Sequence, residues 1–442
     1  MQKEKIRIGC GAGFSGDRLG PSLVLAEQGE LDYLVLECLA ERTIGLAQKR
    51  KMHDPNQGYD PLLERRIESL LPLLVQNKIR LITNMGAANP IAAAKKIQDI
   101  ARNLGLHIKI AALTGDDVLE KLDTSASALE TNRALSSAGK IISANAYLGV
   151  EGILAALQTG AHIVITGRVA DPSLFLAPMI HELGWPSDDF DLMGKGTVIG
   201  HLLECAGHLT GGYFVDPIKK PVAGMDRLGH PFADVYKNGT ALISKVKGTG
   251  GVVNLQTAKE QLLYEVINPY EYFTPDVIAD FSTVKLKEIG EDEIQVTGGT
   301  GKTKPSSYKV SVGYKAYFLG EGEISYAGSA ALERAELAGN ILQQRLAHKV
   351  DQLRIDLLGL NAIHRTVFNP NQAPPYEIRL RVAAQCQNPE LAALVGEEVE
   401  ALYTNGPAGG GGVRKYVNEV IGIVSTLMER AEIVPIVTLF ES

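Results

Sequence analysis

Cysteine is scarce in this sequence, and the few cysteines form no recognisable pattern. The 442 residues include four of them, Cys10, Cys38, Cys205 and Cys386, with no C-x-x-C pair. A disulfide framework or a cysteine zinc site needs paired or closely spaced cysteines. We therefore expect reduced thiols, which favours a cytoplasmic protein over a secreted one.

Long apolar runs and an excess of basic residues are also missing. No stretch reaches the roughly 18 apolar residues that indicate a membrane span, and residues 1–5 lead into a strand-like run with no signal-peptide core. The net charge is −7, whereas binding of nucleic acid needs a basic face that neutralises phosphates. We therefore expect no membrane and no nucleic-acid partner, and favour a small-molecule ligand.

Two common catalytic signatures are absent as well. The sequence has neither the G-x-S-x-G elbow of serine hydrolases nor the G-x-x-x-x-G-K-[ST] phosphate loop. Its composition, 45% hydrophobic and 21% charged, is that of a globular protein with a sizeable core. The length predicts two or three domains of ordinary size.

The first half of the chain alternates short apolar runs with helix-length amphipathic stretches. Strands that alternate with helices predict a parallel sheet covered on both faces. We therefore expect an α/β fold with a Rossmann-like parallel-sheet domain over residues 1–215. The expected strands are residues 6–10, 33–36, 79–83, 108–113, 141–144 and 162–166, and the clearest helices are residues 62–76, 91–104 and 150–159.

The pattern changes after residue 212. Residues 213–221 contain two prolines and are typical of a linker, and strand-like alternation dominates afterwards. We expect an α+β domain over residues 216–442. Its expected strands are residues 284–289, 293–297, 308–312, 317–324 and 376–384, its expected helices are residues 328–345 and 390–403, and residues 406–412 form a glycine-rich loop.

Three glycines follow the first predicted strand. Gly11, Gly13 and Gly16 have the G-x-G-x-x-G spacing, and Glu37 ends the second strand about 20 residues further on, as in dinucleotide-binding units. Asp17 directly after the third glycine would repel a phosphate at the same helix end. The pattern leaves open an NAD site, a site for another polar ligand, and a purely structural turn.

Polar side chains gather where each predicted parallel strand ends. In open α/β sheets, ligands bind beyond the carboxyl ends of the strands, which all lie at one edge. We expect one crevice there, although each residue could equally be a turn residue or a helix cap. The residues are Arg18, Glu37, Arg42, Asn84, Asn89, Asp116, Asn145, Arg168 and Asp171.

A predicted helix near residue 200 carries an acid–base stripe. His201, Glu204 and His208 are spaced so that they share one helix face. Such a face can hold a divalent metal or supply a general acid–base pair, whereas a buried polar stripe is the structural alternative. Arg168 suits bidentate binding of a carboxylate or phosphate.

The glycine-rich loop at residues 406–412 is the last candidate. Backbone amides of successive glycines can form an anion nest, and Arg414 and Lys415 next to it favour an anion. Gly409 and Gly410 are therefore predicted to contact substrate, with the loop closing as a lid. A flexible surface loop is the alternative.

Several longer strings together resemble the acyclic terpene utilisation (AtuA-like) family, over nearly the whole chain. They are GAGFSGDR (11–18), YLVLECLAERT (33–43), GAANP (86–90), ANAYLG (144–149), ITGRVADP (165–172), GHLLECAG (200–207), QLLYE (261–265) and TNGPAGGGG (404–412).

The resemblance implies a pathway without naming a reaction. The family is associated with bacterial breakdown of citronellol and geraniol through coenzyme A thioesters. Relatives often carry a further C-terminal segment or are encoded beside a small separate protein, so the resemblance also implies a small companion subunit. No catalytic residue is carried over from the family.

We expect an enzyme of branched-chain or terpenoid carboxylic acid or acyl-CoA catabolism, a hydratase or lyase, in a homo-oligomer. An NAD-dependent oxidoreductase and a non-catalytic pathway subunit are the alternatives, and a metal is left open. The catalytic candidates are Glu37, Asp116, Asp171, His201 and Glu204. The substrate-binding candidates are Gly11, Gly13, Gly16, Arg18, Arg42, Asn84, Asn89, Asn145, Arg168, Gly409 and Gly410.

Overall fold

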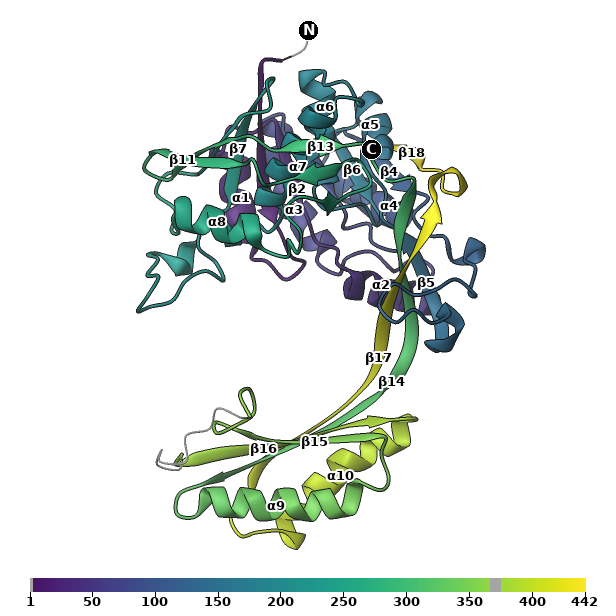
Figure 1. The fold of residues 1–442 in the computed structure, drawn as a ribbon, viewed down its shortest axis with the longest axis vertical. Helices are drawn as coiled ribbons and strands as arrows, with labels where there is room; N and C mark the ends of the chain where they lie inside the picture. Colours follow the sequence, from purple (N-terminus) through teal and green to yellow (C-terminus); the bar gives the residue numbers. More distant parts are fainter. Residues whose placement is uncertain (1–2, 366–374) are drawn as a thin grey trace. The chain divides into compact units, whose positions relative to one another are not determined.

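The chain has a mixed α/β fold in two compact units. A computed structural model describes residues 3–365 and 375–442 (Figure 1). The first unit holds Met1–Leu135, Ile142–Gly313 and Ile423–Ser442, and the second holds Ser136–Ile141 and Tyr314–Gly422. Among the described residues, no helix combines the length and apolar character needed to cross a bilayer.

A large mixed sheet forms the first unit, in the order β11-β12-β8-β7-β1-β2-β3-β6-β4-β18. Its parallel strands are β1 (Lys5–Ala12), β2 (Tyr33–Leu36), β3 (Arg80–Thr83), β6 (Ile163–Thr166) and β4 (Lys109–Thr114). The antiparallel strands that flank them are β7 (Pro231–Tyr236), β8 (Ala241–Lys245), β11 (Lys285–Gly290), β12 (Glu293–Thr297) and β18 (Ile436–Glu441).

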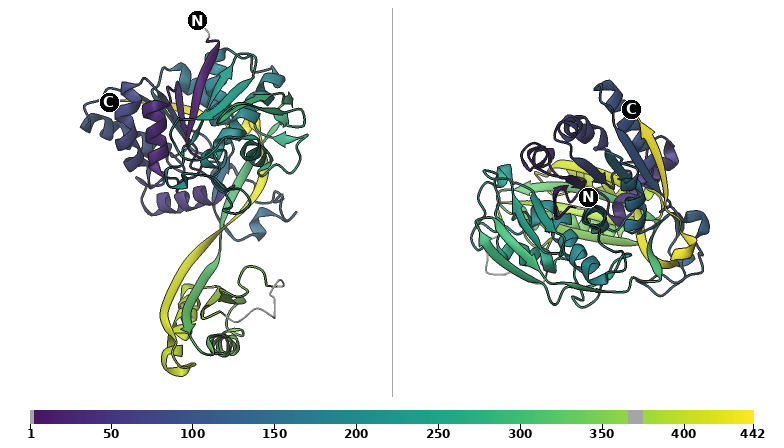
Figure 2. Two further views of the ribbon diagram at one scale, coloured as in Figure 1. Left: turned by 90° about the vertical axis from the view of Figure 1, so that its left-hand side faces the viewer. Right: turned by 90° about the horizontal axis from the view of Figure 1, so that it is seen from above.

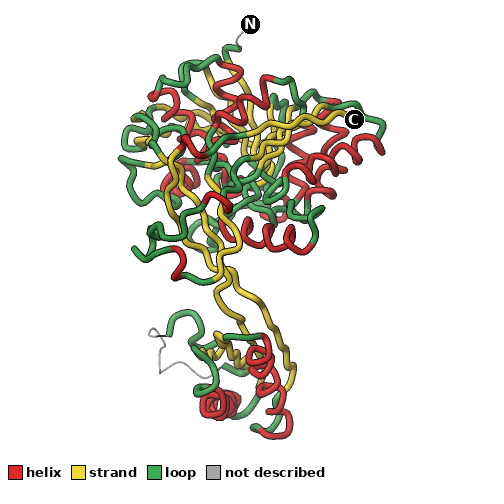
Figure 3. The backbone as a smooth tube through the Cα atoms, turned by 90° about the vertical axis from the view of Figure 1, so that its right-hand side faces the viewer, coloured by secondary structure: helices red, strands yellow, loops and turns green. Residues whose placement is uncertain are grey.

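Helices cover both faces of the parallel strands (Figure 3). Helices α1 (Leu19–Gln28), α3 (Leu63–Gln76) and α4 (Pro90–Asn103) share one apolar core with strand residues such as Leu34 and Ile165. Because successive strand side chains point to opposite faces, the neighbouring buried residues Val35 and Val164 face the other way. The remaining helices of this unit are α2 (Glu41–His53), α5 (Val150–Gln158), α6 (Ser173–Leu183), α7 (Phe190–Glu204) and α8 (Leu255–Leu263).

The strand–helix alternation predicted from the sequence is present, but the strand order is not that of a Rossmann domain. A Rossmann sheet has the order 3-2-1-4-5-6, with the first strand inside the parallel set. Here β1 lies at one end of the parallel set, and β6 is inserted between β3 and β4. In a Rossmann sheet, the ligand crevice lies beside the first strand, where the strand order reverses. The strand order at β1 in this protein has no such reversal within the parallel set.

Residues after 216 complete the first sheet. The division into compact units falls at residues 313 and 422, whereas the sequence placed a domain boundary at residue 215. The reason is that β7 pairs with β1, and β8, β12 and β11 follow it outward. A small sheet of β9 (Tyr272–Phe273), β10 (Ile278–Asp280) and β13 (Thr300–Lys302) packs against α7.

The second unit has the β-α-β-β-α-β order of a ferredoxin-like motif. Its sheet has the order β15-β16-β14-β17, with β15 (Gln352–Leu358) and β16 (Glu377–Cys386). Strands β14 (Ser307–Ala327) and β17 (Gly411–Glu429) are long neighbours, green and yellow in Figure 2, that contribute to both units. Helices α9 (Ala331–Leu346) and α10 (Pro389–Asn405) pack on one face in a separate apolar core. Strand β5 (Lys140–Ala146), at the position of a strand predicted for the parallel sheet, lies outside that sheet and pairs with β14.

Candidate functional site

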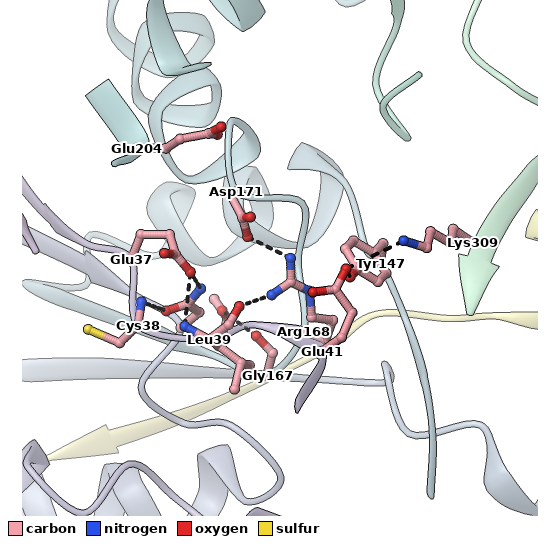
Figure 4. Close-up of polar contacts among 12 residues, drawn as sticks. Glu37, Cys38, Leu39, Glu41, Tyr147, Gly167, Arg168, Asp171, Glu204 and Lys309 are labelled. Carbon is pink, nitrogen blue, oxygen red and sulfur yellow. Dashed lines mark hydrogen bonds and ion pairs between the residues drawn. The ribbon is translucent and has the colours of Figure 1, made fainter. Parts of the chain in front are cut away.

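A buried arginine lies at the centre of a polar cluster in the first unit (Figure 4). Arg168 follows β6 and is 1% exposed. Its guanidinium donates hydrogen bonds to the Leu39 carbonyl and, at 2.6 Å, to Asp171 Oδ1. The guanidinium carbon also lies 4.1 Å from the centre of the Tyr147 ring. Arg168 Nε is buried without a hydrogen-bond partner in the described part of the chain.

One carboxylate of the cluster stays ionised and balances this cation. Glu41 accepts a hydrogen bond from the Tyr147 hydroxyl and lies 3.4 Å from Lys309 Nζ. Burial disfavours its charge, but the positive charge of Arg168 and the Tyr147 hydrogen bond outweigh burial and lower the pKa of Glu41 to about 2. At neutral pH this carboxylate is therefore charged, and it is held by the Tyr147 hydrogen bond and the Lys309 ion pair.

A second carboxyl group favours the protonated form. Glu37, 8% exposed, follows β2 and accepts hydrogen bonds of 2.9 Å from the Leu39 amide and from Asn84 Nδ2. Asn84 in turn accepts a bond from the Cys38 amide at 2.7 Å. Burial raises the pKa of Glu37 well above its usual range, and the neighbouring charge of Asp171 raises it further. Its surroundings thus favour the protonated form of Glu37.

Asp171 is more accessible than Glu37, with about a third of its side chain (34%) exposed. Burial of the rest raises the pKa of Asp171 to about 7, the charges of Glu204 and Glu41 act in the same direction, and Arg168 opposes them. Both protonation states are therefore populated near neutral pH, which is the condition a general acid or base requires.

The predicted stripe on α7 forms a His–Glu pair. His201 Nδ1 lies 2.8 Å from Glu204 Oε1. In the described part of the chain, His201 Nε2 and Glu204 Oε2 are buried and have no hydrogen-bond partner. The rings of Tyr272 and Phe281 each lie 5.4 Å from the His201 ring. Burial raises the pKa of Glu204, and its hydrogen bond to His201 opposes the rise.

Asp116 and Asn145 support Arg168 from the ends of their strands. Asp116 Oδ2 accepts hydrogen bonds of 2.9 Å from the Arg168 amide and from Asn145 Nδ2. Asn145 Oδ1 accepts a bond from Gln48 at 3.3 Å. A Cβ at Gly167 would overlap the Asp116 carboxyl group, which explains the glycine before the arginine. Asp116 is thus held against the backbone that carries Arg168.

The glycines after β1 pack against the chain itself. The Gly13 amide donates a 2.8 Å bond to Asp17 Oδ2, and a Cβ at Gly13 would overlap the backbone of Glu204 and Cys205. The Gly11 carbonyl accepts a 2.6 Å bond from Ser22. Gly16 is exposed but closely packed against the ring of Phe14. An amide that could bind a phosphate therefore already binds the chain's own carboxylate.

Five further candidates make other contacts. Arg18 is exposed and donates to the Met225 and Asp226 carbonyls at 3.3 and 3.4 Å. Arg42 is exposed on α2. Asn89 caps α4 and donates 2.8 Å bonds to the carbonyls of residues 55 and 57. Gly409 and Gly410 lie in the second unit, beside Arg334 and Tyr326.

The structure therefore brings together about half of the predicted residues and adds others. Hydrogen bonds join Glu37 with Asn84, Arg168 with Asp116 and Asp171, and Asp116 with Asn145. Glu37, Asn84, Asp116 and Arg168 follow parallel strands that share one edge, whereas Asn145 lies on β5, outside the parallel set. Sequence reasoning missed Tyr147 and Lys309. Tyr147 carries a usable signal, because it follows Asn145 at a strand end. Lys309 has none, since it reaches the cluster through pairing of distant segments.

The sequence left open a metal site on the α7 stripe, and the described residues do not assemble one. Among residues 3–365 and 375–442, no three His, Cys, Asp or Glu side chains gather closely enough to hold a metal ion. His208 stacks on Tyr213, with ring centres 5.2 Å apart. The helix ends at Glu204, and Ala206 adopts a left-handed backbone conformation, which breaks the i, i+7 alignment.

Comparison with known proteins identifies the family. The family model described as "Acyclic terpene utilisation family protein AtuA" matches residues 6–439. No curated protein and no solved structure matches the chain. Because the match covers nearly the whole sequence, the chain belongs to the acyclic terpene utilisation family, and this membership indicates a role in the use of acyclic terpenes.

Proposed function

We propose that this chain is a hydro-lyase that adds water to, or removes it from, a carboxylic acid or acyl-CoA of branched-chain or terpenoid catabolism. The observation that carries the proposal is Asp171, an accessible acid that holds its proton near neutral pH while hydrogen-bonded to the buried cation Arg168. Carboxyl groups with pKa values driven apart by their surroundings mark acid and base roles. Glu41 and Asp171 differ in this way.

The reaction needs a base, an acid and a group that stabilises negative charge on the carbonyl oxygen. In the direction of water loss, the His201–Glu204 pair accepts the proton from the carbon next to the carbonyl. Asp171 donates a proton to the departing hydroxyl group. The C–H and C–O bonds break, a C=C bond forms, and water leaves.

Arg168 has two roles in this scheme. It fixes Asp171 through the 2.6 Å hydrogen bond, and its positive charge stabilises the carbonyl oxygen as negative charge develops there. Glu37 serves as a proton store beside Asp171, because burial and the charge of Asp171 both favour its protonated form. Asp116 and Asn145 hold the Arg168 backbone in place.

The test is a turnover assay on a panel of unsaturated and hydroxylated acids and acyl-CoAs. We expect hydration or dehydration of at least one compound, and a fall in kcat of about 10²- to 10⁴-fold in Asp171→Asn, the range for loss of a general acid. The matched control is Asp123→Asn, an exposed carboxylate in a turn, which should keep the wild-type rate. Absence of turnover across the panel would contradict the proposal and favour a non-catalytic pathway subunit.

The companion subunit and the homo-oligomer remain predictions of this proposal. The assay is therefore run on the chain alone and together with a small companion protein of the same pathway. Light scattering on the same sample gives the oligomeric state. If kcat and KM are the same with and without the companion protein, the companion subunit is not needed for catalysis.

A further inference from the structure

A group of three aromatic side chains lies just beyond the end of α7. We call His208, Tyr213 and Tyr264 the aromatic cluster. The His208 and Tyr213 rings are nearly parallel, 13° apart with centres separated by 5.2 Å, and Tyr264 meets His208 edge-on at 5.1 Å. Tyr213 is nevertheless 85% exposed. One face of its ring is therefore supported by the chain, and the other is open.

The backbone around this cluster is strained. Ala206, Tyr213 and Glu265 have φ values of +43°, +61° and +60°, in the left-handed region that residues other than glycine rarely adopt. Such conformations cost free energy and concentrate at functional sites. Since an 85% exposed ring buries little apolar surface in return, stability alone gives no reason for Tyr213 to be held in this way.

The aromatic cluster is joined to the acid–base site through α8. Gln261 on α8 donates a 2.8 Å hydrogen bond to the His201 carbonyl, and Tyr264 directly follows the end of α8. His208 follows Glu204 by one turn of chain, over the 3₁₀ turn η3 (Ala206–His208). The cluster therefore adjoins the His201–Glu204 pair within the first unit.

The carboxylate of Glu265 affects pKa values both in the aromatic cluster and around the His201–Glu204 pair. Burial raises the pKa values of Glu204, Cys205, Tyr264 and Tyr272, and the negative charge of Glu265 adds to each rise. A charge acts on four groups in this way only when it lies close to all of them. The charge of Glu265 is therefore felt both in the aromatic cluster and at the His–Glu pair, in agreement with the link through Gln261.

We propose that the aromatic cluster holds the apolar part of the substrate, with Tyr213 as a specificity-determining residue. This rests on the proposed function for the position of the reacting end, at Asp171 and Arg168. The open face of Tyr213 offers a flat apolar surface, and the ring stacks on His208, which follows the His201–Glu204 pair along the chain. An aromatic ring that is supported on its other face binds an apolar chain with little loss of side-chain freedom.

The test uses saturated carboxylates, which cannot react. Affinity for butanoate and hexanoate is measured by calorimetry for the wild type and for Tyr213→Phe, Tyr213→Gly and the control Tyr416→Ser, an exposed tyrosine of the second unit. Two buried methylenes correspond to about tenfold in affinity. We expect this gain in the wild type, in Tyr213→Phe and in the control, and a gain below about twofold in Tyr213→Gly.

Glycine adopts positive φ without strain, so Tyr213→Gly should melt no lower than the wild type even though the chain-length effect is lost. An unchanged chain-length effect in Tyr213→Gly would overturn the inference, and so would equal affinities for the two acids in the wild type. The proposed function is judged separately: loss of turnover without loss of the chain-length effect would contradict the reaction and leave the binding surface in place.

Discussion

At the scale of single residues, the candidate site contains one buried cation, Arg168, surrounded by several carboxyl groups. A buried charge is tolerated only when paired and hydrogen-bonded. Arg168 meets this requirement by sharing its contacts among a carbonyl, Asp171 and the Tyr147 ring, while Glu41 supplies the opposite charge. Three other carboxyl groups nearby, those of Glu37, Asp171 and Glu204, have raised pKa values. These groups can therefore donate and accept protons in the proposed reaction.

Asp116 gives a prediction about stability and pH. Burial raises its pKa from 3.8 to about 6, and the side chain is only 4% exposed. The folded state therefore binds this proton more tightly than the unfolded state, so the contribution of Asp116 to stability is greatest below about pH 4 and is lost as pH rises through 6. The Asp116→Asn protein should not lose stability in this way, because asparagine does not titrate.

Urea unfolding of both proteins at several pH values tests the Asp116 prediction. Relative to Asp116→Asn, the wild type should lose about 2 kcal/mol between pH 4 and pH 7, at about 1.4 kcal/mol per pKa unit. Parallel stability curves for the two proteins would show that the Asp116 carboxyl group titrates normally. Asp123→Asn serves as the control, because Asp123 is exposed.

At the scale of elements, the sequence predicts the strand ends well and the contacts of the first turn poorly. Glu37, Asn84, Asp116 and Arg168 each follow a short apolar run, and the parallel order brings these ends to one edge. Local patterning suffices there because parallel strands share their direction. The closing of Gly13 against the end of α7 is a tertiary contact between distant segments, which no local pattern reports.

A contact between distant segments also explains why the predicted linker is not a boundary between the two compact units. Residues 213–221 contain two prolines and a break in the pattern, which locally favours a domain boundary. The pairing of β7 with β1, from Lys5↔Tyr236 to Gly9↔Phe232, brings the chain back to the first sheet. Tyr147 and Lys309 reach the site in a comparable way, since the Tyr147 amide donates to the Lys309 carbonyl. Such long-range pairings cannot be deduced from periodicity.

The turn after β1 gives a prediction about nicotinamide cofactors. An NAD-dependent oxidoreductase needs free amides at this turn, but the Gly13 amide binds Asp17 and β1 lies at the end of the parallel set. We therefore expect no change in melting temperature with millimolar NADH. A bound ligand at 100 times its Kd would add about 2.7 kcal/mol, so a rise of several degrees would restore the cofactor hypothesis. A known dehydrogenase in the same buffer is the positive control.

At the scale of the whole molecule, two units with separate apolar cores share the strands β14 and β17. Each core can respond to its own substitutions, since multidomain proteins often depart from two-state unfolding. Leu380 in the second core and Leu81 in the first are both fully buried on strands. They form a matched pair for testing independence.

Calorimetry of Leu380→Ala and Leu81→Ala tests the separation of the cores. Each substitution should cost about 2–5 kcal/mol, and each should lower a different melting transition while leaving the other in place. The opposite result is a single transition that both substitutions lower to the same extent. That result would mean the shared strands couple the two cores into one cooperative body.

The proposed reaction depends on Asp171, beside Arg168, holding its proton near neutral pH. Carbon NMR of the protein labelled at aspartate carboxyl groups measures this directly, without knowledge of the substrate. We predict a carboxyl resonance that titrates near pH 7, is absent in Asp171→Asn and is retained in Asp123→Asn. An Asp171 carboxyl group that titrates near the ordinary aspartate value of about 4 would contradict the account.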